Sequence, residues 1–152
     1  MSDAVKIVRK LNDKTIEVSL PSKLGYERIA MESSASFAKI VGFMKERIED
    51  LKTAVSEACL NAMEHGNKGR DDARVVVTMS FENDVLSVSV KDEGKGISEF
   101  PHEPDIEKKV EKLEPSKGLG VFLIKQLVDQ VEFNNTTEDG HVVKMDIKLT
   151  RS

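Results

Sequence analysis

Hydrophobic and polar positions alternate along residues 74–81 and 85–91, a period of two that predicts a pair of β-strands. The polar residues Glu82 to Asp84 between them indicate a tight turn, so the two strands should form a hairpin. Four more strands are expected in two pairs around the turn signals Asn12-Asp13 and Asp139-Gly140, at residues 5–9, 15–20, 130–134 and 142–149.

Apolar residues recur at helical spacing in three other stretches. The first helix is expected from Leu24 until Gly42. The second covers residues 45–65, with Gly66 as its C-terminal cap, and the third covers residues 118–128. Helices on one face of a mixed, mainly antiparallel sheet make an α/β two-layer sandwich, which is the fold class that we predict.

The stretch from Ser98 to Lys117 differs in composition, because half of its residues are charged and three are prolines. We interpret it as a lid of about residues 98–117. Two structures fit this segment equally well. One is a short amphipathic helix after Pro104, with its apolar side formed by Ile106, Val110 and Leu113, and the other is a partly disordered loop.

Length and composition indicate one domain over residues 1–152, able to bury roughly two-thirds of its unfolded surface. The charged fraction of 33% and net charge of −4, without a clustered basic surface, argue against direct nucleic-acid binding. The single cysteine, Cys59, is expected to be a buried, inert thiol. Because no apolar run reaches the roughly 18 residues of a membrane span and the N-terminus lacks the apolar segment of a signal peptide, we expect a cytoplasmic protein without membrane contact.

The second predicted helix carries a polar stripe on an otherwise apolar surface. In its segment AVSEACLNAMEH, Glu57, Asn61 and His65 stand four residues apart, which places them on one helix face. A carboxylate and an amide that face a core are costly to desolvate without partners. We therefore expect the stripe to line a pocket for a charged ligand or a metal.

Two glycine pairs follow along the chain. The expected strand VLSVSVKD ends at Asp92 and leads into Gly94 and Gly96. Gly118 and Gly120 stand at the mouth of the third helix, where backbone N–H groups and the helix dipole favour a phosphate. Either pair alone is a weak signal, but the order of the stripe and the two pairs is specific.

In this order the segments resemble the N, G1 and G2 boxes of the ATP-binding superfamily shared by gyrase, sensor histidine kinases and mismatch-repair ATPases. The matching segments are EACLNAMEHGN at residues 57–67, DEGKGI at 92–97 and KGLGVFLIKQLVD at 117–129. Within the superfamily the chain looks most like the small anti-sigma-factor serine/threonine kinases, whose length and segment IEDLKTAVSEA it shares. The resemblance covers nearly the whole chain.

The resemblance implies roles for the polar residues in binding ATP or ADP with Mg²⁺. Asn61 would give its amide oxygen to the magnesium ion, a hard cation that prefers oxygen ligands. Glu57 would accept or orient the proton of the attacking hydroxyl, with a simple ion pair as the alternative. Asp92 would accept a hydrogen bond from the exocyclic amine of adenine, which guanine replaces by a carbonyl. His65 would complete the stripe, with a favourable contact to the helix dipole as the alternative.

The glycine-rich segments would hold the rest of the nucleotide. Gly94 would leave room for the base, and Gly96 would allow the lid to start. Gly118 and Gly120 would approach the phosphates through their backbone N–H groups, while Lys117 would add a charge there or remain solvated. The implied nucleotide site also includes Ile97, Leu119 and Val121.

The chain departs from the family pattern at two places. Some members carry an arginine in the lid just ahead of the second glycine pair, but this chain has Ser116 and Lys117 at that place. Lysine binds phosphate less well there, because it lacks the two parallel N–H groups of arginine. A serine or threonine in the last strand often supports the adenine-binding aspartate, but residues 141–145, HVVKM, offer no hydroxyl. We therefore expect modest ATP affinity or turnover.

Three functions fit these features. The first is a kinase that phosphorylates a small anti-sigma-factor antagonist and otherwise sequesters a sigma factor. The second is a detached sensor histidine kinase ATPase domain, although none of His65, His102 and His141 has the context of a phospho-accepting histidine. The third is a nucleotide-gated binding module without transfer activity, against which the intact Glu57 argues. The sequence leaves a homodimer open.

Overall fold

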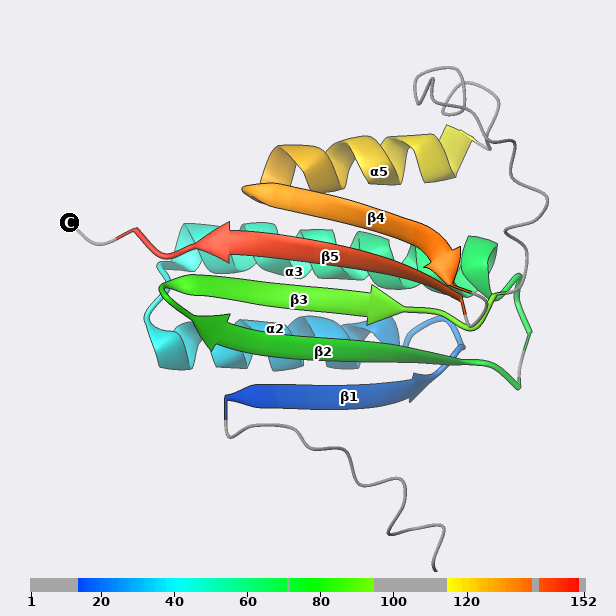
Figure 1. The fold of residues 1–152 in the computed structure, drawn as a ribbon, viewed down its shortest axis with the longest axis horizontal. Coiled ribbons are helices and arrows are strands. Elements are labelled where there is room, and N and C mark those ends of the chain that lie inside the picture. The colour runs from blue at the N-terminus through cyan, green and yellow to red at the C-terminus, as the bar shows by residue number, and fades with distance from the viewer. Residues whose placement is uncertain (1–13, 71, 95–114, 138–139, 151–152) are drawn as a thin grey trace, which may run out of the picture.

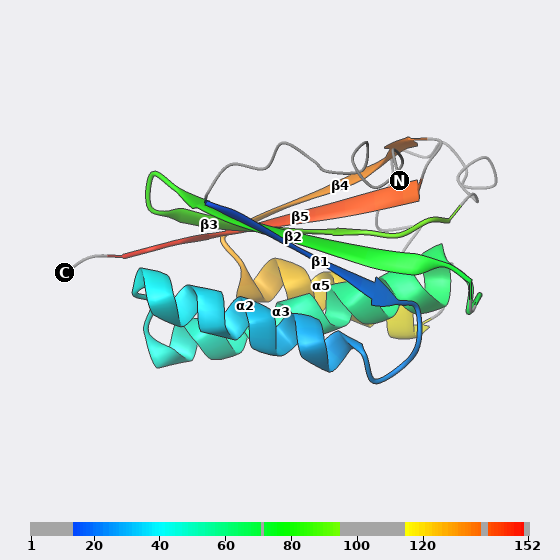
Figure 2. The ribbon, with the colours of Figure 1, turned by 90° about the horizontal axis from the view of Figure 1, so that it is seen from below.

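The protein has two layers, a β-sheet and a set of helices that cover one of its faces (Figures 1 and 2). The computed structural model describes residues 14–70, 72–94, 115–137 and 140–150. The strand expected at residues 5–9 and the lid residues 104–113, for which a short helix and a loop were both considered, lie outside these ranges. The arrangement of the layers confirms the predicted α/β two-layer sandwich.

The sheet joins five strands in the order β1-β2-β3-β5-β4. Their bounds are Thr15–Pro21 for β1, Arg74–Glu82 for β2, Val85–Lys91 for β3, Gln130–Thr137 for β4 and Gly140–Lys148 for β5. All four pairings among these described strands are antiparallel, whereas we predicted a mixed, mainly antiparallel sheet. Because β3 and β5 are antiparallel neighbours, the end of β3 lies beside the start of β5 (Figure 1).

The hairpin of β2 and β3 follows from the alternation of its residues. Asn83 and Asp84 both adopt the left-handed backbone conformation, with φ of 55° and 64°, as a two-residue type I′ turn requires. Residues between the buried ones, such as Ser87 and Ser89, belong to the opposite face of the sheet. The core face of the hairpin consists of Val75, Val77, Met79, Leu86, Val88 and Val90.

The helical layer is built around its central helix, α3. The bounds of the helices are Glu27–Val41 for α2, Lys45–Asn61 for α3 and Pro115–Leu127 for α5, with a π-helical turn, η1, at Ala62–Gly66. Helix α3 packs against both α2 and α5 (Figure 1). The buried stripe of α2 consists of Ala30, Ser34 and Ala38, small residues that permit close helix packing. Within the described ranges, none of the helices is both long and apolar enough to cross a membrane.

The end of the second predicted helix differs from the prediction. Gly66 does not cap an α-helix, because α3 continues into η1, where the N–H of Asn67 donates to the carbonyl of Ala62 five residues back. This π-type bond inserts an extra residue into the turn. Gly66 is buried within the turn and packs against Asp92, so a close approach and not a left-handed cap requires glycine here.

The start of the third predicted helix also differs. Helix α5 begins at Pro115, three residues earlier than predicted. Proline suits the first position of a helix because the N–H that it lacks would have no helical partner there. Gly118 and Gly120 therefore lie inside the first turns of α5 and not at its mouth.

Cys59 belongs to the buried face of α3 and is fully buried, as predicted. Burial, with a contribution from the Glu27 carboxylate, raises the pKa of the Cys59 thiol to about 12. Because the thiolate is the reactive form, this thiol is inert in the folded protein.

Candidate functional site

Glu57 and Asn61, from the polar stripe of α3, meet at one point of α5. A β-carbon built on Gly120 would lie 2.8 Å from Oε1 of Glu57. It would lie 3.2 Å from Nδ2 and 3.4 Å from Oδ1 of Asn61. Gly120 is buried, whereas Glu57 and Asn61 are half-buried. The absence of a side chain at Gly120 therefore lets α5 approach both polar groups without displacing them.

Four other predicted site residues also lie in α5: Lys117, Gly118, Leu119 and Val121. Leu119 is exposed and Val121 is half-buried. His65, the third residue of the polar stripe, is half-buried in η1. Gly96 and Ile97 lie outside the described residues, so their roles stay predictions.

The turn η1 leads from Asn61 to a second polar cluster, at the end of β3. Gly66, the last residue of η1, packs directly against Asp92, and a β-carbon at Gly66 would collide with the Asp92 carboxylate. Glu57 and Gly66 are nine residues apart, which corresponds to roughly 13 Å at the helical rise of about 1.5 Å per residue. One continuous helical segment thus connects the two clusters.

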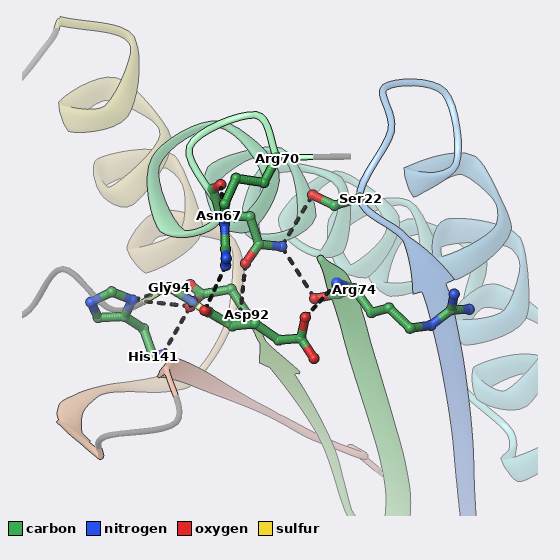
Figure 3. Close-up of polar contacts among 8 residues, drawn as sticks. Ser22, Asn67, Arg70, Arg74, Asp92, Gly94 and His141 are labelled. Carbon is green, nitrogen blue, oxygen red and sulfur yellow. Dashed lines mark hydrogen bonds and ion pairs between the residues drawn. The ribbon is translucent and has the colours of Figure 1, made fainter. Parts of the chain in front are cut away.

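The carboxylate of Asp92 is buried and held by hydrogen bonds from two segments (Figure 3). Oδ1 accepts from the N–H of Gly94 at 2.8 Å and from the N–H of His141 at 3.0 Å. Nδ1 of the His141 ring lies 3.1 Å from Oδ1 and 3.2 Å from Oδ2. The N–H of Asp92 in turn donates to the carbonyl of His141 at 3.0 Å. The end of β3 and the start of β5 therefore fix this carboxylate together.

These contacts lower the pKa of Asp92. Burial on its own would raise the pKa, but the hydrogen bonds from the His141 side chain, the His141 N–H and the Gly94 N–H outweigh burial and hold the pKa below its ordinary value. Asp92 is therefore ionised at neutral pH, and an ionised carboxylate only accepts hydrogen bonds.

We expect Asp92 to stabilise the fold only where it is ionised. A carboxyl group whose pKa is lowered by folding adds stability above its unfolded pKa of about 3.9, and this stability is lost as the pH falls through the lower folded pKa. In urea unfolding, wild type should exceed Asp92→Asn in free energy of unfolding near neutral pH, by an amount that shrinks as the pH falls below about 4. A difference that is constant over this range would contradict the expectation.

Asn67 connects three segments beside the end of β3. Its Nδ2 donates to Oγ of Ser22, after β1, and to the carbonyl of Arg74 in β2, both at 3.1 Å (Figure 3). Its Oδ1 accepts from the N–H of Glu93 at 2.7 Å. Because Asn67 is fully buried, these hydrogen bonds satisfy its amide and fix the backbone that follows Asp92.

Comparison with known proteins identifies the family. The family described as histidine kinase-like ATPase domain matches residues 20–147. Serine-protein kinase RsbW of Bacillus pumilus is 36% identical over 130 residues, which cover 77% of this chain and 76% of that protein. Serine-protein kinase RsbW of Listeria monocytogenes is 35% identical over 133 residues, which cover 80% of each protein. The chain belongs to the RsbW family of serine-protein kinases.

The RsbW-family assignment agrees with a solved structure. The structure of the RsbU and RsbW domains of a Mycobacterium tuberculosis protein matches with a TM-score of 0.67 and 18% identity. The match covers 95% of this chain and 35% of that chain. At this identity the likeness establishes the fold alone. The sequence similarity, in contrast, confirms the resemblance inferred from the three motifs and makes ATP the ligand of this domain.

Two residues that hold the polar cluster at Asp92 together were missed by sequence reasoning. Asn67 ends the first motif, but hydrogen bonds that join three distant segments have no local pattern. His141 lies opposite Asp92 because Lys91 pairs with Val142 in the antiparallel register of β3 and β5. Only that strand register would have identified His141 as a neighbour of the carboxylate.

Proposed function

We propose that the protein is an ATP-dependent serine/threonine kinase and anti-sigma factor, which phosphorylates a small antagonist protein and otherwise sequesters a sigma factor. The observation that carries the proposal is the meeting of Glu57 and Asn61 at Gly120. Membership of a family of serine-protein kinases supports the transfer of phosphate to a hydroxyl group. A homodimer stays a prediction.

Asp92 binds the adenine end of the nucleotide in this proposal. A buried, ionised carboxylate is a strong acceptor for the exocyclic amine of the base, and it disfavours a base with a carbonyl at that position. The phosphates then lie at the other end of the helical segment, beside Glu57 and Asn61. The separation of the two clusters along α3 and η1 suits an elongated nucleotide.

Glu57 is the general base of the transfer step. Its carboxylate accepts the proton of the serine or threonine hydroxyl while the hydroxyl oxygen forms a bond to the terminal phosphorus of ATP. The bond between that phosphorus and the bridging oxygen of ADP breaks at the same time. The products are ADP, the phosphorylated protein and a protonated Glu57, which returns its proton to water.

Asn61 fits the role of magnesium ligand. Its amide oxygen lies beside Glu57 at a position that α5 leaves without a side chain, and amide oxygens are hard ligands that suit Mg²⁺. In the described part of the chain, no three His, Cys, Asp or Glu side chains are grouped to hold a metal ion. Most ligands would therefore come from the phosphates and water. Bound Mg²⁺ would neutralise phosphate charge.

Gly120→Ala is expected to separate activity from stability. The added methyl group would press on Glu57 and Asn61, whose flexible ends move at little cost, and alanine favours the helix by about 1 kcal/mol over glycine. Displacement of both groups should lower transfer by roughly tenfold to 10²-fold. Thermal unfolding should show equal or higher stability, and Lys125→Ala on the exposed side of α5 should change neither quantity. Transfer at the wild-type rate in Gly120→Ala would contradict this role of the glycine.

Incubation with γ-labelled ATP and a candidate antagonist, such as a small protein encoded beside its gene, tests the proposed function. Acid-stable phosphate on the antagonist, formed far more slowly with Glu57→Gln, is the expected result. Acid-labile phosphate would indicate histidine chemistry. Nucleotide binding without any transfer would indicate a nucleotide-gated binding module.

A further inference from the structure

His141 contributes more contacts to Asp92 than any other residue of the described chain. Its N–H, its carbonyl and its ring nitrogen Nδ1 all bind the aspartate, through backbone and side chain together. Because an ionised carboxylate cannot donate, Nδ1 must carry the proton of this contact. The ring of His141 is therefore a hydrogen-bond donor to the carboxylate that the proposed function assigns to adenine.

The two oxygens of Asp92 are not equivalent. Oδ1 accepts from three donors: the Gly94 N–H, the His141 N–H and His141 Nδ1. Oδ2 shares only the Nδ1 contact among the donors in the described segments. A carboxylate oxygen has two lone pairs, so Oδ1 is saturated and Oδ2 retains capacity for one more donor. A ligand amine would therefore bind at Oδ2.

Glycines from three segments let the backbone pack closely around Asp92. A β-carbon at Gly66 would collide with Oδ2, and one at Gly94 would collide with the carbonyl of Gly66. A β-carbon at Gly140, whose φ of 137° favours glycine, would collide with the carbonyl of Asp92. The backbone thus packs closely against Asp92, and the His141 ring contacts the carboxylate from the side of β5 (Figure 3).

We propose that His141 is the positioning residue that sets base specificity, since its Nδ1–H holds the carboxylate of Asp92 with Oδ2 available to the exocyclic amine of adenine. This inference rests on the proposed nucleotide site at Asp92. It also explains how the segment HVVKM supports an adenine-binding aspartate without a hydroxyl group, because the imidazole supplies the donor.

The ring of His141 sharpens the choice between an amine and a carbonyl. The described groups around the Asp92 carboxylate all donate hydrogen bonds to it, so the carboxylate stays ionised and acts only as an acceptor. The bound base must therefore present a donor to it. Hypoxanthine carries a carbonyl where adenine carries the amine, so it would place an acceptor against an acceptor. Without the ring, the carboxylate can turn or take up a proton, and the preference for the amine should fall.

Calorimetric titration with ADP and with inosine diphosphate, both with Mg²⁺, tests this role. Wild type should prefer ADP. His141→Ala should reduce the ratio of the two affinities by about tenfold, through loss of ADP binding. His141→Asn should restore most of the ratio, because its amide nitrogen stands near the position of Nδ1. His141→Gln is the matched control, since its amide nitrogen lies one bond further out and should not restore the ratio.

Each result decides between distinct interpretations once circular dichroism has shown that the variants are folded. An unchanged ratio in His141→Ala overturns the specificity role. An equal loss of both nucleotides, without recovery in His141→Asn, also overturns it, because a purely structural role predicts that pattern. If wild type binds neither nucleotide, the proposed function itself fails. If wild type binds ADP normally and His141→Ala leaves the affinity ratio unchanged, only the specificity role of His141 fails.

Discussion

Glu57→Gln is expected to lower phosphoryl transfer by roughly 10²-fold or more while ADP affinity stays near its wild-type value. Glutamine keeps the size of glutamate and its capacity to accept a hydrogen bond, but its amide does not take up the hydroxyl proton. Initial rates of transfer to the protein acceptor, together with calorimetric titration of ADP on the same preparation, measure both quantities.

Glu64→Gln is the matched control for this prediction. Glu64 lies in η1, on the same helical segment as Glu57, but its side chain is exposed. The control should leave transfer and binding unchanged. Transfer at the wild-type rate in Glu57→Gln would refute the role as proton acceptor, and a loss of ADP binding would show that Glu57 holds the nucleotide instead.

Asp92→Asn is expected to weaken ADP binding by about one to two orders of magnitude, since a hydrogen bond to a charged acceptor contributes roughly 1.5–3 kcal/mol. An asparagine amide has one acceptor and one donor side. If its oxygen faces the N–H groups of Gly94 and His141, its NH₂ group faces the ligand amine, donor against donor. The opposite orientation satisfies the ligand but opposes the two backbone donors.

Titration of ADP into folded Asp92→Asn measures this loss, and Asp72→Asn provides the control. Asp72 is exposed in the segment before β2, so its neutralisation changes the net charge equally without touching the site. Unchanged ADP affinity in Asp92→Asn would remove Asp92 from the adenine site. An equal loss in both variants would assign the effect to overall charge.

Local patterns predicted most of the fold and the placement of Glu57 and Asn61 on one helix face. The alternation in β2 and β3, with Asn83 and Asp84 between them, predicted the hairpin because turn and strands are close in sequence. The four-residue spacing of Glu57 and Asn61 predicted their common face for the same reason. Their motifs also carried the family resemblance that the comparisons confirm.

The features that sequence reasoning missed depend on distant segments or on small changes in hydrogen bonding. The π-type bond from Asn67 to Ala62 changes one hydrogen bond and leaves no periodic signal, so Gly66 was wrongly interpreted as a cap. The approach of His141 to Asp92 depends on the pairing of β3 with β5, two strands that are about fifty residues apart in the sequence. Neither interaction is visible in a window of neighbouring residues.

In the proposed site, residue 66, residues 92–94 and residues 140–141 together form the Asp92 cluster, so nucleotide binding there depends on the folded chain. An unfolded chain holds these segments apart, so ATP and ADP bind the native state alone. At a nucleotide concentration of about 100 times Kd, the free energy of unfolding rises by about 2.7 kcal/mol. Proteases that attack the unfolded chain then find it roughly 10²-fold less often, and depletion of the adenylate pool shortens the lifetime of the protein.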